Sequence, residues 1–156
     1  MTLSFILSNF GGKTDNKPAP TTYTWEDFLA RLPAPAIRAN KDGALYAGAS
    51  FEPARRLKAN VKEVSVLALD YDDGAALDAT VEKWKRLGVT SAWYTTHSHQ
   101  RVKNPGEKSE KPPCDRYRVV IPLDGAIPAV YYPALWRWAE RQADGVVADS
   151  SPNARS

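Results

Sequence analysis

The sequence contains a single cysteine and only two histidines, and these shortages exclude several classes of site. One cysteine, Cys114, allows no intramolecular disulfide and no cysteine-rich zinc site, and it is typical of a reducing compartment, so we expect a cytoplasmic location. No apolar run approaches the roughly 18 residues that cross a bilayer. The N-terminal MTLSFILSNF also lacks the basic start and the small-residue cleavage site of a signal peptide. We therefore expect no membrane partner.

The composition predicts a globular domain, and its basic residues indicate what kind of partner the protein could bind. The 156 residues are 43% hydrophobic and 25% charged, which predicts one domain with a substantial core. The formal net charge of +3 permits an anionic partner such as nucleic acid without requiring one. Basic residues gather in two segments, namely Arg55, Arg56 and Lys58 in the first and Arg101, Lys103, Lys108 and Lys111 in the second.

The beginning of the chain is expected to divide into a linker and the start of a folded domain. Residues 11–22, GGKTDNKPAPTT, are typical of a loop. We therefore expect residues 1–22 to form a loosely packed N-terminal segment and residues 23–156 to form the domain. Thr24 is followed three residues later by Asp27, a spacing typical of a helix start, and the helix should end at Pro33.

The middle of the chain predicts a β-α-β unit followed by a further strand and a final helix. VSVLALD at 64–70 is typical of a strand buried on both faces, and SAWYTT at 91–96 of a second strand. Apolar residues at helical spacing between them predict a helix that ends at Gly88. The polar, proline-rich residues 100–113 predict a mobile loop, and RYRVVIPL at 116–123 predicts the next strand.

Three aspartates follow the first buried strand within four positions, in LALDYDDG at 67–74. Because strand side chains alternate, Asp70 and Asp72 should point to the same side, and Mg²⁺ prefers such oxygen ligands. The pattern favours a divalent metal site; the alternative is a solvated turn at Asp73-Gly74 in which Asp70 caps the next helix. We expect Asp70→Ala or Asp72→Ala to leave the fold intact, because either change removes a repulsion between carboxylates.

Two further groups of polar residues stand at strand ends. His97 and His99 lie two positions apart in YTTHSHQ, so both imidazoles could face one anion or metal site. Arg116 and Arg118 alternate with other residues in CDRYRVVIPL, so both guanidinium groups should leave one face of a strand, where arginine suits phosphate recognition. The alternative for the arginines is an ion pair with an aspartate of a neighbouring strand.

These segments, in this order, resemble the archaeo-eukaryotic primase superfamily, specifically the primase-polymerase domains of plasmids and phages, over roughly residues 36–156. LALDYD matches the family's first motif, an apolar strand that ends in Asp-x-Asp. TTHSH matches its small-x-His motif, and Ala148-Asp149 in VVADSS matches its apolar residue followed by a single acid. RYRVVIPL looks like the arginine-bearing strand that follows the histidine motif.

The resemblance implies an α+β domain with an RRM-like mixed or antiparallel sheet flanked by helices. It implies template-directed nucleotidyl transfer, as a DNA primase or polymerase that makes or extends primers in replication of a plasmid, phage or other mobile element. Asp70, Asp72 and Asp149 would bind Mg²⁺ or Mn²⁺, and the motif histidine, with Arg116 or Arg118, would contact the incoming nucleotide. The implied partners are nucleoside triphosphates, a single-stranded DNA template and a helicase in the natural polypeptide or complex.

Several assignments within the resemblance stay open. Either His97 or His99 can be the motif histidine, with His99 preferred because it lies closer to the following loop. Asp124, which also follows an apolar strand, competes with Asp149 as the third acid, and Asp149 ranks first. Family domains usually continue past the third motif, so two alternatives stay open, a truncated domain and a minimal one, and either could lack activity.

Three other functions compete with nucleotidyl transfer. A non-catalytic DNA-binding replication module would bind the phosphates of DNA with the two basic segments. A replication-initiator nickase would use a His-x-His metal pair at His97 and His99 and a tyrosine nucleophile at Tyr131 or Tyr132. A haloacid-dehalogenase-type phosphatase would use LDYDDG, although its first aspartate belongs near an N-terminus.

Overall fold

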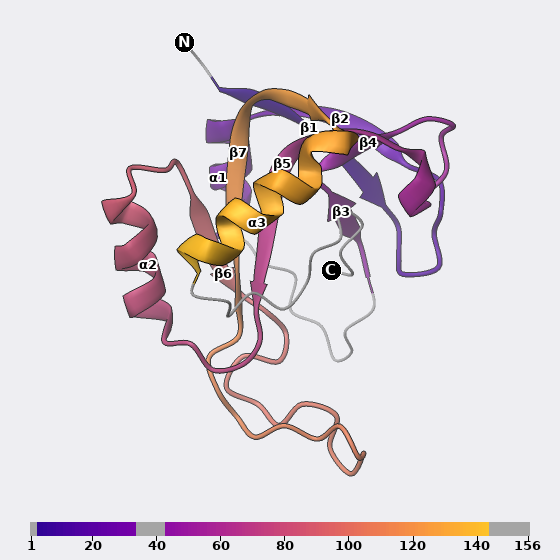
Figure 1. Ribbon diagram of the computed structural model, residues 1–156. Coiled ribbons are helices and arrows are strands. Elements are labelled where there is room, and N and C mark those ends of the chain that lie inside the picture. Colours follow the sequence, from indigo (N-terminus) through magenta and orange to yellow (C-terminus); the bar gives the residue numbers. More distant parts are fainter. Residues whose placement is uncertain (1–2, 34–42, 144–156) are drawn as a thin grey trace.

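Two antiparallel sheets carry the fold of the computed structural model, which describes residues 3–33 and 43–143 (Figure 1). The first sheet has the strand order β2-β1-β3 and the second the order β4-β5-β7-β6. The strands of the first sheet are β1 (Ser4–Phe10), β2 (Ala19–Thr24) and β3 (Leu45–Ala47). Those of the second are β4 (Ala49–Phe51), β5 (Val61–Tyr71), β6 (Ala92–Thr95) and β7 (Tyr117–Pro128).

Local sequence signals mark the start of one helix and the end of another. The helices of the described residues are α1 (Trp25–Arg31), α2 (Leu77–Arg86) and α3 (Tyr132–Gln142), with short 3-10 turns η1 (Lys58–Asn60) and η2 (Ala129–Tyr131). The Thr24 hydroxyl accepts a hydrogen bond of 3.0 Å from the Asp27 backbone N–H, as the capping pattern predicted. Gly88, with φ of +67°, follows the end of α2. The expected α+β class is confirmed.

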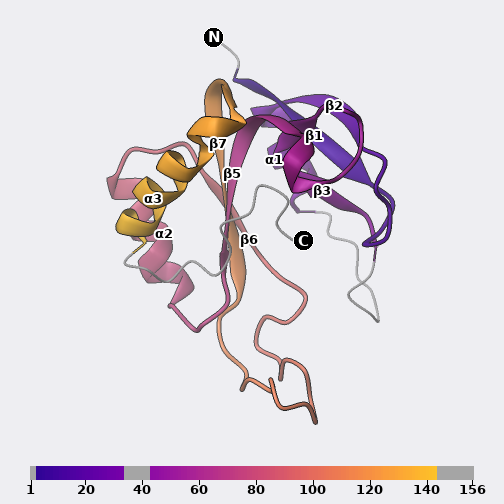
Figure 2. The ribbon, with the colours of Figure 1, turned by 45° about the vertical axis from the view of Figure 1, so that its right-hand side comes forward.

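The second sheet contains the predicted β-α-β connection with a strand inserted into it. Both β5 and β6 pair antiparallel with β7, which lies between them, so β5 and β6 run parallel to each other. Helix α2 forms the connection between β5 and β6, and α3 follows β7. Figures 1 and 2 show α2 and α3 on the same side of this sheet. The strands joined by α2 are therefore not neighbours, because β7 takes the place between them.

The second sheet is buried on both faces, as the apolar run of β5 predicted. On the helix side, Leu67 and Leu69 belong to a core that includes Trp84 of α2. On the other side, Val66 packs with residues of β1 and α1, among them Phe5. The period of two along β5 thus supplies one set of side chains to each core.

The N-terminal segment packs tightly, and the expectation of loose packing is wrong. β1 is the middle strand of the first sheet, and its side chains Phe5, Leu7 and Phe10 are only 4%, 3% and 4% exposed. These apolar residues belong to two buried clusters, one of which also contains Val66 of β5 and Val120 of β7. The loop-like composition of residues 11–22 describes only the turn after β1 and the exposed edge strand β2.

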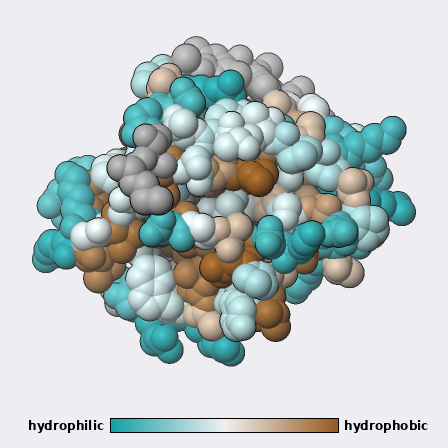
Figure 3. All heavy atoms as spheres, turned by 90° about the horizontal axis from the view of Figure 1, so that it is seen from above, coloured by the Kyte–Doolittle hydropathy of each residue, from teal (hydrophilic) through white to brown (hydrophobic). Residues whose placement is uncertain are grey.

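Exposed apolar side chains are dispersed over the surface. The most exposed of the large ones are Val130 and Tyr131 in η2, at 76% and 62%. In the view from above, brown apolar residues are interspersed with teal hydrophilic ones (Figure 3). Among the described residues, no helix has both the length and the apolar character that crossing a membrane requires.

Gly48 allows the chain to pass from the first sheet to the second at a very close approach to β5. Its carbonyl accepts hydrogen bonds from the backbone N–H groups of Ser65 and Val66, at 2.9 and 3.2 Å. A Cβ placed on Gly48 would lie 2.6 Å from both the Cβ and the carbonyl oxygen of Val66. The two sheets can therefore come together here only because residue 48 has no side chain.

We expect Gly48→Ala to lower the free energy of unfolding by about 1–3 kcal/mol, because the backbone of β5 must shift to admit the methyl group. Urea denaturation measures this change. Gly11→Ala is a matched control, since a Cβ at Gly11 would meet only a carboxylate oxygen of Asp15 at 3.5 Å. Equal effects of the two substitutions would show that the close approach is not a constraint.

Candidate functional site

The antiparallel pairing of β5 with β7 places an aspartate directly opposite an arginine. Asp70 pairs in register with Arg118, and Tyr71 with Tyr117. The two tyrosine rings stack with centroids 4.9 Å apart, and both belong to the helix-side core. Asp70 and Arg118 therefore point to the opposite face, where Arg118 donates from Nε to Oδ1 at 2.6 Å and from Nη2 to Oδ2 at 2.7 Å. The ion-pair alternative for this arginine is confirmed.

Arg118 is committed to Asp70 in a largely buried position. Its side chain is 7% exposed, and the hydroxyl groups of Tyr46 from β3 and Tyr94 from β6 make a hydrogen bond of 2.6 Å nearby. Burial alone would lower the pKa of Arg118, but the hydrogen bonds and charge of Asp70 raise it above the ordinary range. Burial also raises the pKa of Tyr46. Arg118 thus stays charged and orients the Asp70 carboxylate.

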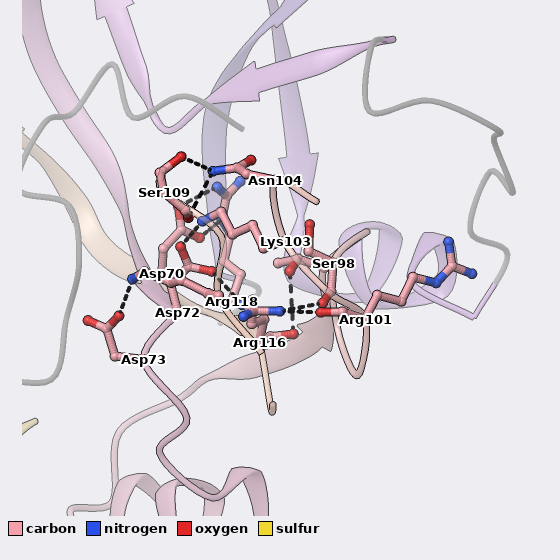
Figure 4. Close-up of polar contacts among 12 residues, drawn as sticks. Asp70, Asp72, Asp73, Ser98, Arg101, Lys103, Asn104, Ser109, Arg116 and Arg118 are labelled. Carbon is pink, nitrogen blue, oxygen red and sulfur yellow. Dashed lines mark hydrogen bonds and ion pairs between the residues drawn. The ribbon is translucent and has the colours of Figure 1, made fainter. Parts of the chain in front are cut away.

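The other two aspartates of the motif contact lysines from the loop that follows β6. The Lys103 ammonium contacts Asp72, and the Lys111 ammonium lies 2.6 Å from Oδ1 of Asp73 (Figure 4). The hydrogen bond from Lys111 lowers the pKa of Asp73, and the same bond raises the pKa of Lys111. Each of the three aspartates therefore has a cationic partner.

Arg116 holds the loop in place with a fully buried side chain. Its Nη1 donates to the carbonyls of Ser98 and Arg101, and its Nη2 donates to the carbonyl of Pro112, each at 2.8 Å. Its Nε lies 3.3 Å from Oδ1 of Asp72 and makes no hydrogen bond. The side chain is 0% exposed. The structure thus commits Arg116 to internal contacts, which corrects the expectation that its guanidinium is presented to a phosphate.

His99 is joined to the aspartates through Arg116, whereas His97 is exposed. The backbone N–H of Arg116 donates to Nδ1 of His99 at 3.1 Å. A neutral His99 therefore carries its proton on Nε2, which is then a hydrogen-bond donor. Five of the expected site residues thus gather at one end of the second sheet: Asp70, Asp72, His99, Arg116 and Arg118.

Neither candidate for the third acid is placed in this group. Asp149 lies outside the described residues. Asp124 is exposed on β7, six residues beyond Arg118. At about 3.3 Å per residue this separates the two positions by roughly 20 Å along the strand, so Asp124 lies away from the aspartate motif.

The tyrosines that a nickase would need are also far from the histidines. Tyr131 and Tyr132 follow the C-terminal end of β7, whereas His99 contacts Arg116, just before its N-terminal end. Tyr132 is moreover only 5% exposed. The structure therefore does not bring either tyrosine to the His-x-His pair.

Sequence reasoning missed the partners that the loop supplies. Lys103 and Lys111 were recognised only as part of a basic segment, and no periodicity connects them with Asp72 or Asp73. Asp115 was not considered: its carboxylate accepts a 2.9 Å hydrogen bond from the Leu77 backbone N–H at the start of α2, and that bond lowers the pKa of Asp115. A lone acid before a strand gives no local signal of a helix that begins nearly 40 residues earlier.

Carboxylate oxygens such as those of Asp70 and Asp72 are ligands that Mg²⁺ and Mn²⁺ prefer, but both carboxylates already contact cations, Arg118 at Asp70 and Lys103 with Arg116 at Asp72. The side chains of Asp70 and Asp72 are 20% and 25% exposed. Among the described residues, no group of three or more histidine, cysteine, aspartate or glutamate side chains is placed to hold a metal ion. Each carboxylate keeps lone pairs beside those that face the arginines, so a divalent ion at positions 70 and 72 would compete first with the Lys103 ammonium.

The charged side chains around the three aspartates carry a net positive charge. Asp70, Asp72 and Asp73 contribute three negative charges, and their partners Arg116, Arg118, Lys103 and Lys111 contribute four positive ones. The closed group thus carries a net charge of +1, which repels a further cation.

Comparison with models of protein families found no match, and searches of curated proteins and of solved structures found no significant match.

Proposed function

We propose that this chain is the core of a metal-dependent, template-directed nucleotidyltransferase of the primase-polymerase type. The observation that carries the proposal is the meeting of three separate sequence segments at one end of the second sheet. The Asp-x-Asp of β5, the histidine segment after β6 and the arginines at the start of β7 are linked by direct contacts. Carboxylate oxygens beside a donor imidazole suit a divalent ion and the phosphate oxygens that it contacts, while the two arginines hold this arrangement together.

The strand order supports an RRM-like core for the second sheet. β7 lies between the parallel strands β5 and β6, and α2 and α3 both pack on one face. The aspartates and Arg118 lie on the opposite face. The first sheet and α1 cover much of that face, but Asp70 and Asp72 at its end are 20% and 25% exposed, and an extended ligand such as a single-stranded DNA template would approach there.

The chain's own residues have distinct roles in this proposal. Asp70 and Asp72 would hold Mg²⁺ or Mn²⁺, with Asp149 as the proposed third ligand; when bound, the ion polarises the triphosphate and lowers the pKa of the attacking hydroxyl. Arg118 keeps the Asp70 carboxylate in one orientation through its two hydrogen bonds. His99, fixed through Nδ1, presents its Nε2–H to a phosphate oxygen.

Asp72→Asn is expected to lower template-dependent incorporation of nucleotides at least about 100-fold, because an amide cannot replace a carboxylate ligand. Primer extension on a single-stranded template with Mn²⁺ measures the incorporation, and calorimetry with a nucleoside triphosphate and Mn²⁺ measures binding. Asp124→Asn is the matched control, since Asp124 is exposed and far along β7. Unchanged incorporation by Asp72→Asn would contradict the proposed role.

A non-catalytic nucleic-acid-binding module is the second candidate, and the ion pairs favour it. All three aspartates are neutralised by arginine or lysine, an arrangement that needs no metal. This candidate predicts binding of single-stranded DNA that weakens steeply with salt, together with no incorporation of nucleotides under any metal condition. Incorporation by the wild-type chain would therefore exclude it.

A further inference from the structure

The loop from Ser98 to Pro112, here called the strap, is attached to the body at its base and at its tip. Figure 1 shows it extending beyond the lower end of the second sheet. At the base, the buried Arg116 binds the carbonyls of Ser98, Arg101 and Pro112. Towards the tip, Lys103 and Lys111 exchange two backbone hydrogen bonds of 3.0 Å, so their side chains start side by side.

The two attachments differ greatly in strength. The guanidinium at the base is 0% exposed and makes three charge-assisted hydrogen bonds. The ion pairs at the tip are accessible to solvent: Lys103 and Asp72 are 23% and 25% exposed, and Lys111 and Asp73 are 47% and 57% exposed. An exposed pair such as Lys111 and Asp73 contributes little to stability, and Lys103 and Asp72 also keep some contact with water. The tip can therefore open while the base stays attached.

The segment between the two lysines is a small unit with its own hydrogen bonds. The Asn104 side chain donates to the Ser109 hydroxyl at 3.0 Å, and the Gly106 backbone N–H donates to the Glu110 carboxylate at 2.6 Å. Asn104 and Gly106 both have positive φ, at +53° and +78°. These turns keep Lys103 and Lys111 paired whether or not they contact the aspartates.

We propose that Lys103 and Lys111 are internal counter-ions that hold the strap closed on Asp72 and Asp73 until a divalent cation takes the carboxylates. The inference rests on the proposed function in one respect, namely that Asp70 and Asp72 bind such a cation. Because Lys103 occupies Asp72 and the closed group has a net charge of +1, closure and cation binding compete. By linkage, a cation that binds only the open form shifts the strap towards opening.

Limited trypsin cleavage after Lys103, whose ammonium must leave Asp72 to enter the protease, tests this competition on the full chain and is quantified by mass spectrometry. We expect Mn²⁺, compared with K⁺ at equal ionic strength, to raise the cleavage rate about fivefold, the factor that corresponds to the loss of about 1 kcal/mol of ion pairing. Cleavage after Lys13, in the turn between β1 and β2, is the internal control and should not respond. Equal ionic strength separates cation binding from simple screening.

The Asp72→Asn variant tests the closure of the strap in the absence of any metal ion. The amide keeps an oxygen for the Arg116 guanidinium but loses the charge that holds Lys103, so cleavage after Lys103 should rise without Mn²⁺ and respond to it no further. Asp124→Asn is the matched control and should behave as the wild type. Wild-type cleavage by Asp72→Asn in the absence of metal would overturn the closure by Lys103.

A parallel titration of bound Mn²⁺ by electron paramagnetic resonance separates this inference from the proposed function. Mn²⁺ that binds through Asp70 and Asp72 but leaves the cleavage rate unchanged would overturn the strap mechanism and leave the metal site intact. If Mn²⁺ does not bind, the metal-dependent function is wrong, and so is the proposal that a divalent cation opens the strap.

Discussion

Asp70→Ala is expected to lower the free energy of unfolding by about 3–5 kcal/mol, because it leaves the Arg118 guanidinium buried without its counter-ion. Arg118 is 7% exposed and directs Nε and Nη2 to the two oxygens of Asp70. Tyr46 and Tyr94, which stay in place, cannot neutralise the charge. Urea denaturation monitored by tryptophan fluorescence measures the loss. This expectation replaces the sequence-based one for Asp70, because the adjacent cation outweighs the repulsion between carboxylates.

Asp73→Ala is the control for this first prediction, since its partner Lys111 is 47% exposed and water can replace the lost contact. We expect it to change the free energy of unfolding by less than about 1 kcal/mol. The double variant Asp70→Ala/Arg118→Met should recover part of the loss, because the buried charge is then removed as well. Equal stabilities of Asp70→Ala and Asp73→Ala would show that Arg118 does not depend on Asp70.

Arg116→Ala is expected to lower the free energy of unfolding by about 3 kcal/mol, through the loss of three charge-assisted hydrogen bonds and of a fully buried side chain. Hydrogen exchange should show, in addition, that the backbone amides of the strap lose protection, since both of its ends depend on this guanidinium. Arg116→Lys should not restore the stability, because one ammonium cannot reproduce the planar fork that reaches all three carbonyls.

The control for Arg116 is Arg137→Ala, because Arg137 is exposed on α3. Its loss should change the free energy of unfolding by no more than a few tenths of a kcal/mol. A loss of stability for Arg116→Ala below about 1 kcal/mol would mean that water replaces the guanidinium at the carbonyls without penalty.

The local elements of this fold could be predicted from sequence, because their signals lie within a few residues. The alternation in VSVLALD, the cap at Thr24 and the glycine after α2 are all of this kind. The insertion of β7 between β5 and β6 could not be predicted, since no local pattern states which strand pairs with which. β1 was missed because its apolar residues, Phe5 and Leu7, were considered only as a possible signal peptide.

The part of the site that lies on the strands could be predicted, because side chains alternate along a strand. The period of two predicted that Asp70 and Asp72 share one side, and an ion pair between an arginine and an aspartate of a neighbouring strand was one of the two alternatives for the arginines, which Asp70 and Arg118 fulfil. The contacts of Lys103 and Lys111 depend on a turn with positive φ at Asn104 and Gly106, which brings two distant positions together. Such contacts follow from loop geometry, for which the polar composition of residues 100–113 gives no specific expectation.

The opposite polarity of the two faces where β5 meets β7 also restricts how these strands can align. Tyr71 and Tyr117 stack in the helix-side core, while the adjacent pair Asp70 and Arg118 neutralise each other on the reverse face. A shift of the pairing by one residue would bring the Asp70 carboxylate among aromatic and aliphatic groups and would leave the Arg118 guanidinium without an acidic partner. A misaligned pairing of β5 with β7 is thus destabilised at two consecutive residue pairs, Asp70–Arg118 and Tyr71–Tyr117. The alignment of β5 with β7 is therefore fixed by these two pairs themselves and does not depend on the length of the chain that connects the strands.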